Sequence, residues 1–354
     1  MADSGAYMVL EAERILNTND EPTDLLDELQ IDAPWTLEAF CRKIKIDIVG
    51  QSEDRMELEF DLINVDAPIA NALRRLLIAE VPSMAIDRVF LYQNTSVLQD
   101  EVLCHRIGLL PVRADPRLFD WPTPPTVANE DVTEEPAANE KEAVVFELKV
   151  MCSKNPRAPK EAVDARDRCL HAHVYSGSFT WTPVGEQAQT LALEPPRMVH
   201  DDVLLAKLRP GQEIEARCHC YKGIGRDHAK FSPVATASYR LLPEIRLRRA
   251  IVGEEQSRLF KESFSEGVVE LFTNAQGETE ARLRDARRDL CSLNVLRHDA
   301  LADAVELRRR KRHYIFSVES TGALPASELV VEACRVMQRK CDALSAMVGR
   351  FLEQ

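Results

Sequence analysis

The stretch from Lys222 to Lys230, KGIGRDHAK, holds residue types that often do chemistry in proteins. Two glycines beside cations are typical of a loop that binds phosphate through its backbone N–H groups. An Asp next to a His has the groups needed for acid–base catalysis. The stretch could therefore be the active site of a phosphate-handling enzyme, or a surface that another protein binds.

Neither common nucleotide-binding pattern is complete in this stretch. A dinucleotide-binding fingerprint needs a third glycine where His228 stands, and a Walker loop needs Gly-Lys-Ser or Gly-Lys-Thr. Asp227 is adjacent to His228, and this spacing by itself makes neither residue the orienting group of the other. No Ser or Cys nucleophile follows in a strained elbow. The pattern favours a loop that presents polar groups to a neighbour, because glycines permit close backbone approach.

Two cysteine and histidine clusters raise the question of a metal site. They read CLHAH from Cys169 and CHC from Cys218. Structural zinc sites usually have two to four residues between paired cysteines, and neither cluster has this spacing. Alternation along a β-strand explains both clusters as residues that face one side. We therefore expect no metal and no other cofactor.

The run LRRRKRH, from Leu307 to His313, is a dense cationic segment. It could contact phosphate or serve as a nuclear-import signal. However, Asp299, Asp303 and Glu306 precede it, so a solvated and locally paired face is the other interpretation.

Composition limits the class of protein. The chain has 354 residues, of which 45% are hydrophobic, enough for two domains or one domain with an insertion. No run of 18 apolar residues predicts a membrane span, and the first residues do not resemble a secretory signal. Nine cysteines, an odd number without framework spacing, favour free thiols in a reducing compartment. We expect a cytosolic or nuclear protein.

The net charge of −13 is concentrated in two segments. Residues 1–34 carry a net charge of −8 and residues 120–142 carry −6, which leaves the rest of the chain at +1. Both segments are too polar to pack well, so we expect a mobile acidic arm over residues 1–40 and a flexible loop at 120–142. This balance argues against bulk affinity for nucleic acid.

Hydrophobic periodicity predicts a mixture of strands and helices. Residues 40–50 and 55–65 alternate apolar and polar side chains, which predicts a β-hairpin. A helix should begin at the N-cap Asp66 and stop before Pro82. Strand-like pieces then follow at 88–97, 143–152, 170–185 and 214–223. The final third should be helical, with one last strand at 313–320. The apolar stripe of the first helix consists of Ile69, Leu73, Leu76 and Leu77.

The C-terminal segment has the most regular pattern in the chain. Seven apolar residues recur at alternating spacings of four and three, a period typical of two helices that lie nearly parallel or antiparallel. The segment predicts a helix of about 27 residues and about 40 Å. Its stripe could pack inside the chain or against a partner helix. The seven residues are Val330, Cys334, Met337, Cys341, Leu344, Val348 and Phe351.

Three blocks of the chain resemble the alpha-like subunits of eukaryotic RNA polymerases. They begin DAPIANALRRLL at Asp66, LLAKLRPGQEIEARCHCYKGIG at Leu204 and HYIFSVESTGALP at His313. The details CSKNPRAPK, HVYSGSFTWTPVG and ADPRLF resemble the larger alpha-like subunits shared by RNA polymerases I and III, rather than their polymerase II counterparts. The archaeal alpha-like subunits and the bacterial alpha N-terminal domain belong to the same superfamily. The likeness covers residues 40–350.

The resemblance implies an α+β fold. A dimerisation domain of a sheet plus two long helices would be interrupted by an inserted β-rich domain. Residues 41–84 and 235–354 would form the dimerisation domain, and 85–234 the insertion. The helix carrying Ile69 and the C-terminal helix would pair with a smaller alpha-like subunit.

The resemblance also implies that the opening stretch is a recognition surface. Residues 222–233 and 100–111 would dock the second-largest polymerase subunit. Arginine and lysine side chains would donate charge-assisted hydrogen bonds there, and glycines would allow close approach. The docking residues would be Asp100, Arg106, Lys222, Gly223, Gly225, Arg226, His228 and Lys230.

One departure from the family concerns metals. Polymerase II and archaeal relatives can hold zinc or an iron–sulfur cluster on cysteines of the inserted domain, near residues 117–142 here. That segment has no cysteine, so no metal is carried over.

The resemblance implies a non-catalytic assembly subunit of RNA polymerases I and III, located in the nucleus and nucleolus. It would contact the largest and second-largest subunits, with little direct contact to nucleic acid. A polymerase II-type subunit is the alternative, and an enzyme built on Lys222–Lys230 is a more distant one.

Overall fold

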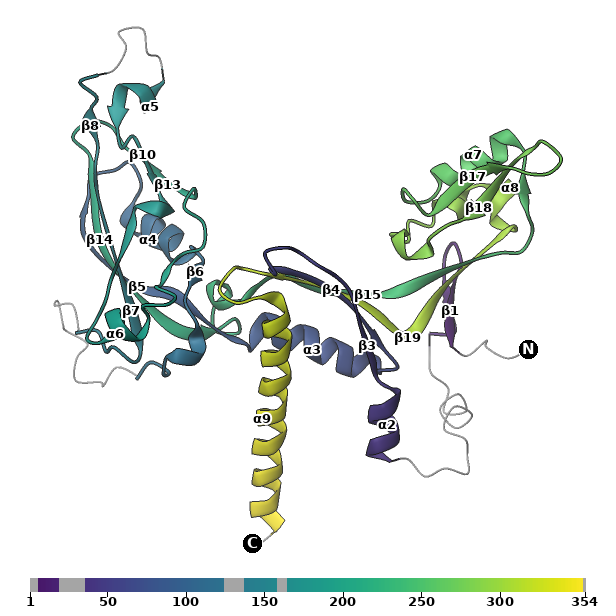
Figure 1. Ribbon diagram of the computed structural model, residues 1–354, viewed down its shortest axis with the longest axis horizontal. Coiled ribbons are helices and arrows are strands. Elements are labelled where there is room, and N and C mark those ends of the chain that lie inside the picture. The colour runs from purple at the N-terminus through teal and green to yellow at the C-terminus, as the bar shows by residue number, and fades with distance from the viewer. Residues whose placement is uncertain (1–5, 19–35, 124–136, 158–163, 353–354) are drawn as a thin grey trace. The chain divides into compact units, whose positions relative to one another are not determined.

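The computed structural model describes residues 6–18, 36–123, 137–157 and 164–352 (Figure 1). The chain divides into two compact units. The first unit contains residues 1–50, 59–71 and 238–317, and the second contains 51–58, 72–237 and 318–354. Strands and helices occur in both units, so the predicted α+β class is confirmed. In the described part of the chain, no helix is long and apolar enough to cross a membrane.

A six-stranded sheet is the larger of the two sheets in the first unit. Its order is β2-β1-β19-β4-β3, and β15 also pairs with β19. The predicted hairpin is present as β3 and β4, closed by a hydrogen bond from the Glu57 N–H to Ser52 Oγ (2.9 Å). The strands are β1 (Tyr7–Leu10), β2 (Ile15–Leu16), β3 (Lys45–Gln51), β4 (Glu57–Ile63), β15 (Val234–Leu247) and β19 (Val305–Ser320).

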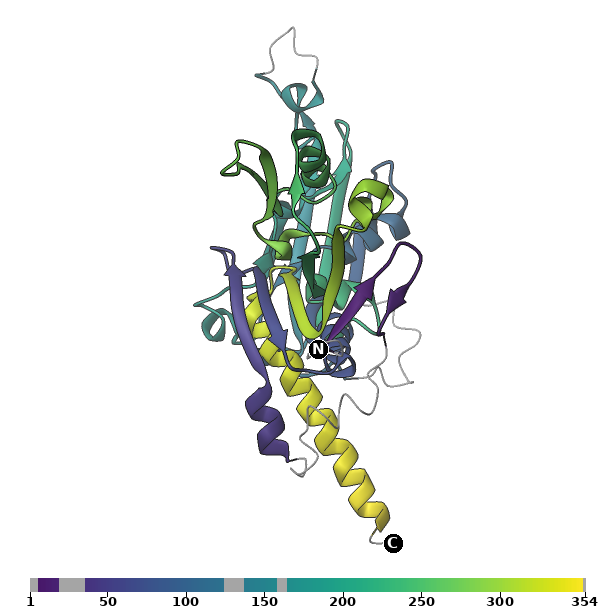
Figure 2. The same ribbon diagram turned by 90° about the vertical axis from the view of Figure 1, so that its right-hand side faces the viewer.

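The prediction of a mobile arm over residues 1–40 is wrong for Tyr7–Leu16. These residues form the hairpin β1–β2, and β1 pairs with β19 from Tyr7↔Arg310 to Leu10↔Leu307 (Figure 2). Tyr7 and Leu10 are buried, and the guanidinium groups of Arg308 and Arg310 lie 5.5 and 5.6 Å from the Tyr7 ring. The prediction rested on the net charge of the whole segment, and it overlooked the short apolar run YMVL that forms β1. The prediction is also wrong for residues 37–40, which are helical. Arm residues 1–5 and 19–35 and loop residues 124–136 lie outside the described residues.

Residues 40–43, predicted as strand, are helical. They belong to α2 (Leu37–Lys43), where Thr36 Oγ1 accepts a hydrogen bond from the Ala39 N–H (3.2 Å). An acidic residue lies in the first turn and two basic residues lie in the last, as the helix dipole favours. None of the α2 residues is buried. Capping and charge therefore decided the local structure where alternation had predicted a strand.

The basic run Arg308–Arg312 lies within β19, a strand much longer than the predicted 313–320. The locally paired interpretation holds for Arg308, whose Nε lies 2.5 Å from Glu306. Two other arginines of the run have partners on more distant elements. Arg310 lies 3.4 Å from Glu244, and Arg312 lies 3.2 Å from Asp66.

The final third contains more strand than predicted. A small antiparallel sheet of order β16-β18-β17 packs with α7 around Ile251, Phe260 and Ala281. Short strands separated by charged residues have no clear periodicity, so the pattern did not predict them. The elements are β16 (Ile251–Val252), α7 (Glu254–Glu262), β17 (Val269–Thr273), β18 (Thr279–Leu283) and α8 (Asp299–Ala302).

A polar network anchors the segment that follows this small sheet. Arg287 Nη1 lies 2.8 Å from Asp61 Oδ2, and its Nη2 lies 2.6 Å from Glu59 Oε1. His313 Nε2 contacts the same Asp61 oxygen at 2.8 Å. Arg287 is in η5 (Ala286–Arg288), whereas the two carboxylates are in β4 and His313 is in β19. The network fixes the small-sheet segment to the larger sheet of the same unit.

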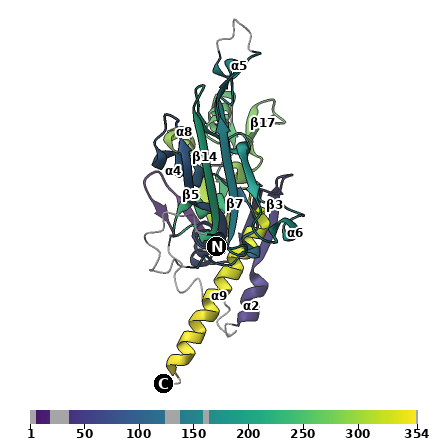
Figure 3. The same ribbon diagram turned by 90° about the vertical axis from the view of Figure 1, so that its left-hand side faces the viewer.

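The second unit is built on a four-stranded antiparallel sheet of order β11-β7-β14-β5 (Figure 3). Its core includes Ile86, Leu103, Phe146 and Cys218, so α4 (Asp100–Gly108) packs on the sheet. Strand predictions at 88–97, 143–152 and 214–223 are confirmed, and 170–185 is strand in part. The strands are β5 (Pro82–Asn94), β7 (Ala143–Met151), β11 (Phe179–Thr182) and β14 (Glu213–Ile224).

Shorter elements complete the second unit. Three two-stranded sheets pair β6 with β12, β8 with β9 and β10 with β13. Their bounds are β6 (Val112–Arg113), β8 (Ser153–Lys154), β9 (Cys169–Leu170), β10 (His173–Tyr175), β12 (Arg197–Met198) and β13 (Leu204–Lys207). The short helices are η1 (Pro116–Leu118), α5 (Ala165–Arg168), η3 (Ser176–Ser178), α6 (Gln187–Thr190) and η4 (Ala229–Phe231).

Both predicted helices are present. In α3 (Ala67–Ala79), the Asp66 carbonyl accepts hydrogen bonds from the N–H groups of Ile69 and Ala70. The chain enters β5 at Pro82, as the stop signal predicted. The C-terminal helix is α9 (Ala326–Leu352), with 27 residues. The predicted domain boundary at 84/85 falls inside β5, and the one at 234/235 falls at the start of β15.

Candidate subunit interfaces

One stripe of α9 attaches this helix to its own unit. Ala326, Leu329, Ala333 and Val336 are buried, at spacings of three and four. Ion pairs from the same unit reinforce the attachment, because Arg117 Nη1 lies 2.9 Å from Glu328 and Lys340 Nζ lies 2.7 Å from Glu80. From residue 337 onward, no described residue of α9 is buried.

The predicted seven-residue stripe is a different one, rotated by about 100° from the buried stripe. None of its members is buried in the chain. Val330 and Met337 are partly covered, and the others are exposed, with Leu344 59% and Phe351 80% accessible. In Figure 1 the C-terminal half of α9 extends beyond the other elements of its unit. Together with Met347 and Leu352, this exposed stripe is an apolar surface of the kind that marks an interaction site.

The apolar stripe of α3 is only partly available to another chain. Ile69 is 38% exposed and Leu73 is partly buried, but Leu76 and Leu77 are buried within this chain. The prediction that all four residues contact a partner helix is therefore wrong for Leu76 and Leu77. A one-sided stripe shows which face of a helix is covered, but not by which chain, so the sequence could not separate the two cases.

The two glycines of the opening stretch serve close packing within this chain. A Cβ atom at Gly223 would lie 2.6 Å from the Phe231 ring, and one at Gly225 would lie 2.2 Å from the Ile78 carbonyl oxygen. The Arg226 N–H then donates to the Ala79 carbonyl at 2.8 Å. The loop thus lies directly against the end of α3. The expectation that these glycines allow a partner to approach is corrected, because the close neighbour is the chain itself.

Three predicted docking cations are also used internally. Lys222 Nζ donates to the Phe119 carbonyl (2.9 Å), and burial lowers the pKa of this lysine. Arg106 donates to the carbonyls of Leu204 and Leu205, and so joins α4 to β13. Lys230 Nζ lies 2.8 Å from Asp87. These contacts explain the cations as structural groups, and they weaken the interpretation of the stretch as a phosphate loop.

The tip of the loop remains exposed. Arg226, Asp227 and His228 are exposed, and no partner of the Arg226 side chain lies among the described residues. His228 is held in place because its Nδ1 accepts from the Lys230 N–H (3.1 Å). Asp100, at the start of α4, accepts from Asn94 Nδ2 (2.8 Å) and is exposed.

The structure brings the two predicted docking stretches together. His105 and Leu109, from the first stretch, and His228 and Lys230, from the second, line one hollow of about 240 Å³. Leu109 is 50% exposed at its rim. Asp87 also lines the hollow. It was not identified from the sequence, because Asp87 lies 143 residues from its partner Lys230 along the chain. The remaining lining residues are Ile86, Val89, Cys104 and Gly108.

The structure thus has a largely exposed apolar stripe on a long helix and a hollow that joins the two predicted docking stretches. The RNA polymerase Rpb3/Rpb11 dimerisation domain family matches residues 59–341, well over half of the chain. The chain belongs to this family. The match begins in β4 and ends at residue 341 in α9, so it includes the stripe from Val330 to Cys341 and stops before Leu344.

Individual members of the dimerisation-domain family are similar over most of the chain. The DNA-directed RNA polymerases I and III subunit RPAC1 of Mus musculus is 47% identical over 91% of this chain and 88% of its own length. The subunit of the same name from Saccharomyces cerevisiae is 43% identical over 88% and 89%. The DNA-directed RNA polymerase II subunit rpb3 of Dictyostelium discoideum is 28% identical over 90% and 98%.

We predict that this family member binds no stoichiometric zinc or iron. Burial raises the pKa of the Cys218 thiol to about 12 and that of Cys220 well above its ordinary value, so neither readily supplies the thiolate that a metal needs. Across the described residues, no group of three or more His, Cys, Asp or Glu side chains could hold a metal ion. Elemental analysis of the purified protein tests this. One metal per chain, lost on Cys218→Ser or Cys220→Ser, would contradict it.

Proposed function

We propose that this chain is the larger alpha-like subunit shared by RNA polymerases I and III, and that it acts as a non-catalytic assembly platform. The observation that carries the proposal is the α9 stripe, which has the heptad spacing of a helix pair and is exposed at Cys334, Cys341, Leu344, Val348 and Phe351. The match to a dimerisation domain supports a smaller alpha-like subunit as the partner.

Sequence similarity supports the polymerase I and III type over the polymerase II type. Relatives named as subunits of polymerases I and III are 36–47% identical to this chain. Relatives named as subunits of polymerases II, IV and V are 28–31% identical. The nucleus is the location that these names imply, and the nucleolus follows for a polymerase I subunit.

The α9 stripe would form the main helix pair, and Ile69 and Leu73 of α3 would extend the contact. Leu76 and Leu77 would support α3 from inside. The hollow between α4 and the loop, together with the exposed Arg226 of the same loop, would dock the second-largest subunit. Contact with the largest subunit completes the platform. Nucleotide addition would take place on metal-binding carboxylates of the large subunits.

Co-purification tests the proposal directly. The tagged full-length chain, expressed in its own cells, should bring down one smaller alpha-like subunit and the large subunits of polymerases I and III. Recovery of polymerase II subunits in their place would contradict the assignment to polymerases I and III. Catalytic turnover by the isolated chain would contradict the non-catalytic role.

Charge reversal at the loop tip separates the two interfaces. We predict that Arg226→Glu leaves the heterodimer intact but weakens docking of the second-largest subunit by about tenfold or more, because it replaces a charge-assisted hydrogen bond with a repulsion. Co-purification of both partners with the variant measures this. Arg209→Glu, at an exposed arginine of the same unit outside both predicted docking stretches, is the matched control. Loss of the smaller subunit on Arg226→Glu, with the large subunit retained, would show that the surfaces are assigned wrongly.

A further inference from the structure

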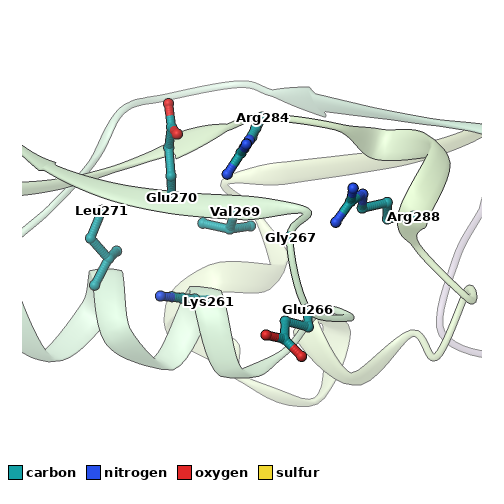
Figure 4. Close-up of a pocket in the computed structure, with 8 residues that line it drawn as sticks. All are labelled: Lys261, Glu266, Gly267, Val269, Glu270, Leu271, Arg284 and Arg288. Atoms are coloured by element: carbon teal, nitrogen blue, oxygen red, sulfur yellow. The ribbon is translucent and has the colours of Figure 1, made fainter.

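A hollow of about 480 Å³ lies beside the small sheet of the first unit and shares no residue with the surfaces described above (Figure 4). Its lining comes from α7, from β17 with the turn before it, and from the segment after β18. The residues are Lys261, Glu266, Gly267, Val269, Glu270, Leu271, Arg284 and Arg288. Three consecutive residues of β17 take part. Since successive side chains of a strand point to opposite faces, the hollow must follow the edge of β17 rather than one face.

Cationic side chains surround this hollow. Within the described residues, Lys261 and Arg284 have no ion-pair partner, and Arg288 Nε lies 3.5 Å from Asp285. Glu266 and Glu270 also line it, and Figure 4 shows the Glu270 side chain on the opposite side of the β17 ribbon from Lys261. Arg284 lies on the Glu270 side of that ribbon, so the hollow has cations on both sides of β17. Among the described residues, no ion pair joins Glu266 or Glu270 to these cations.

Gly267 leaves room for one of these cations, Arg288, because it has no side chain. Its φ is +85°, which favours glycine, and a Cβ atom there would lie 2.7 Å from Arg288 Nη1. The Arg288 side chain therefore lies across the backbone at the entrance to β17. A side chain at position 267 would push this guanidinium group out of the hollow.

The outer edge of β17 has free backbone groups. β17 pairs only with β18 among the described strands. The bonds Asn274 N→Glu278 O and Arg284 N→Val268 O show that even-numbered residues of β17 form the hydrogen-bonded pairs with β18. The N–H and C=O groups of Leu271 and Thr273 must then point outward. An edge of this kind is a template for another strand.

The side chains of this edge suit a partner that is partly apolar. Leu271 is 37% and Phe272 is 41% exposed, on opposite faces of the strand. An added strand with alternating apolar and acidic residues would cover Leu271 with its apolar face and bring carboxylates near Arg284 on the other side of β17. Backbone hydrogen bonds would give affinity, and the cations would select the sequence.

We propose that β17 binds an extended acidic segment of a partner protein, which adds to the small sheet as a fourth strand. The segment pairs with the outward backbone groups of Leu271 and Thr273, its apolar side chains cover Leu271, and its carboxylates contact Arg284 and Arg288. This site is independent of the α9 stripe and of the loop at Lys222–Lys230.

Residue-resolved hydrogen exchange on the full-length chain, in complex with its smaller subunit, tests the proposal. The probe is a capped decapeptide of alternating Glu and Val. We expect it to slow exchange of the Leu271 and Thr273 amides at least tenfold, because they become hydrogen-bonded. The amides of Glu270 and Phe272 should not change, since β18 already pairs with them.

Two control peptides make the experiment selective. A Lys–Val decapeptide should bind weakly because its charges repel the cations. A Glu–Val decapeptide with a central Pro should also fail, because Pro cannot complete the ladder. Equal protection by either control, or no protection by the Glu–Val peptide, overturns the proposal. Binding of inorganic phosphate at the hollow without protection of Leu271 and Thr273 would show a simple anion site and would also overturn it.

A variant of the chain completes the test. Arg284→Glu should weaken binding of the Glu–Val peptide about tenfold, because an exposed ion pair is replaced by a repulsion. Arg258→Glu, on α7 outside the hollow, should bind normally. Unchanged protection of the Phe272 amide shows that the small sheet is still folded in each variant. Unchanged affinity in Arg284→Glu would contradict the role of the cations.

Discussion

Leu344→Asp is expected to abolish pairing of this chain with the smaller alpha-like subunit without unfolding the chain itself. Leu344 is 59% exposed and lies in the middle of the α9 stripe, so its replacement removes no buried contact from this chain. In the pair, the new carboxylate would be buried in an apolar contact without a partner. This costs about 3 kcal/mol or more, which is over a hundredfold in affinity. Co-purification and circular dichroism measure the two effects.

Ala346→Asp is the matched control, because it places the same carboxylate on the opposite side of α9. This variant should pair normally. The unpaired Leu344→Asp chain keeps the rest of its apolar stripe uncovered, so it should be less soluble than the heterodimer. If Leu344→Asp retained the smaller subunit, the exposed stripe of α9 could not be the dimerisation surface.

Gly225→Ala is expected to have the largest effect on stability. The added Cβ would lie 2.2 Å from the Ile78 carbonyl oxygen, and this backbone atom at the end of α3 cannot move aside as a flexible side chain could. Separation of the loop from α3 would also break the hydrogen bond from the Arg226 N–H to Ala79. We expect a loss of on the order of 3 kcal/mol in the free energy of unfolding. Heat denaturation of the purified heterodimer measures it.

Gly349→Ala provides the comparison for this substitution. No atom lies within 4 Å of a Cβ built at Gly349, which is in α9. Alanine should therefore be neutral or stabilise the helix by up to about 1 kcal/mol. If Gly225→Ala were as stable as Gly349→Ala, the close contact between the loop and α3 would not exist in solution.

The sequence alone determined the elements whose patterns are long and regular. The 27 residues of α9 and its seven-residue stripe follow from apolar spacing, because a helix of that length repeats its pattern many times. The limits of α3 followed from Asp66 and Pro82, which act locally on the backbone. The strands β7 and β14 followed from alternation and β-branched residues. Family resemblance then supplied the subunit role, which the match to residues 59–341 supports.

Tertiary structure decided which surfaces are free. Leu77 and Leu344 have the same pattern in the sequence, but one is buried in this chain and the other is exposed. Similarly, Gly225 and Arg226 are neighbours, yet Gly225 packs on α3 while the Arg226 side chain is exposed. Periodicity in the sequence shows only that one face of an element is apolar. The residue type shows only that a side chain is able to form a hydrogen bond or an ion pair. Which neighbour covers the face or accepts the bond depends on segments more than a hundred residues away, such as Asp87 beside Lys230. A local sequence pattern cannot show which distant segments come into contact. Only the folded structure therefore distinguishes the buried core of this chain from the surfaces that remain available to partners.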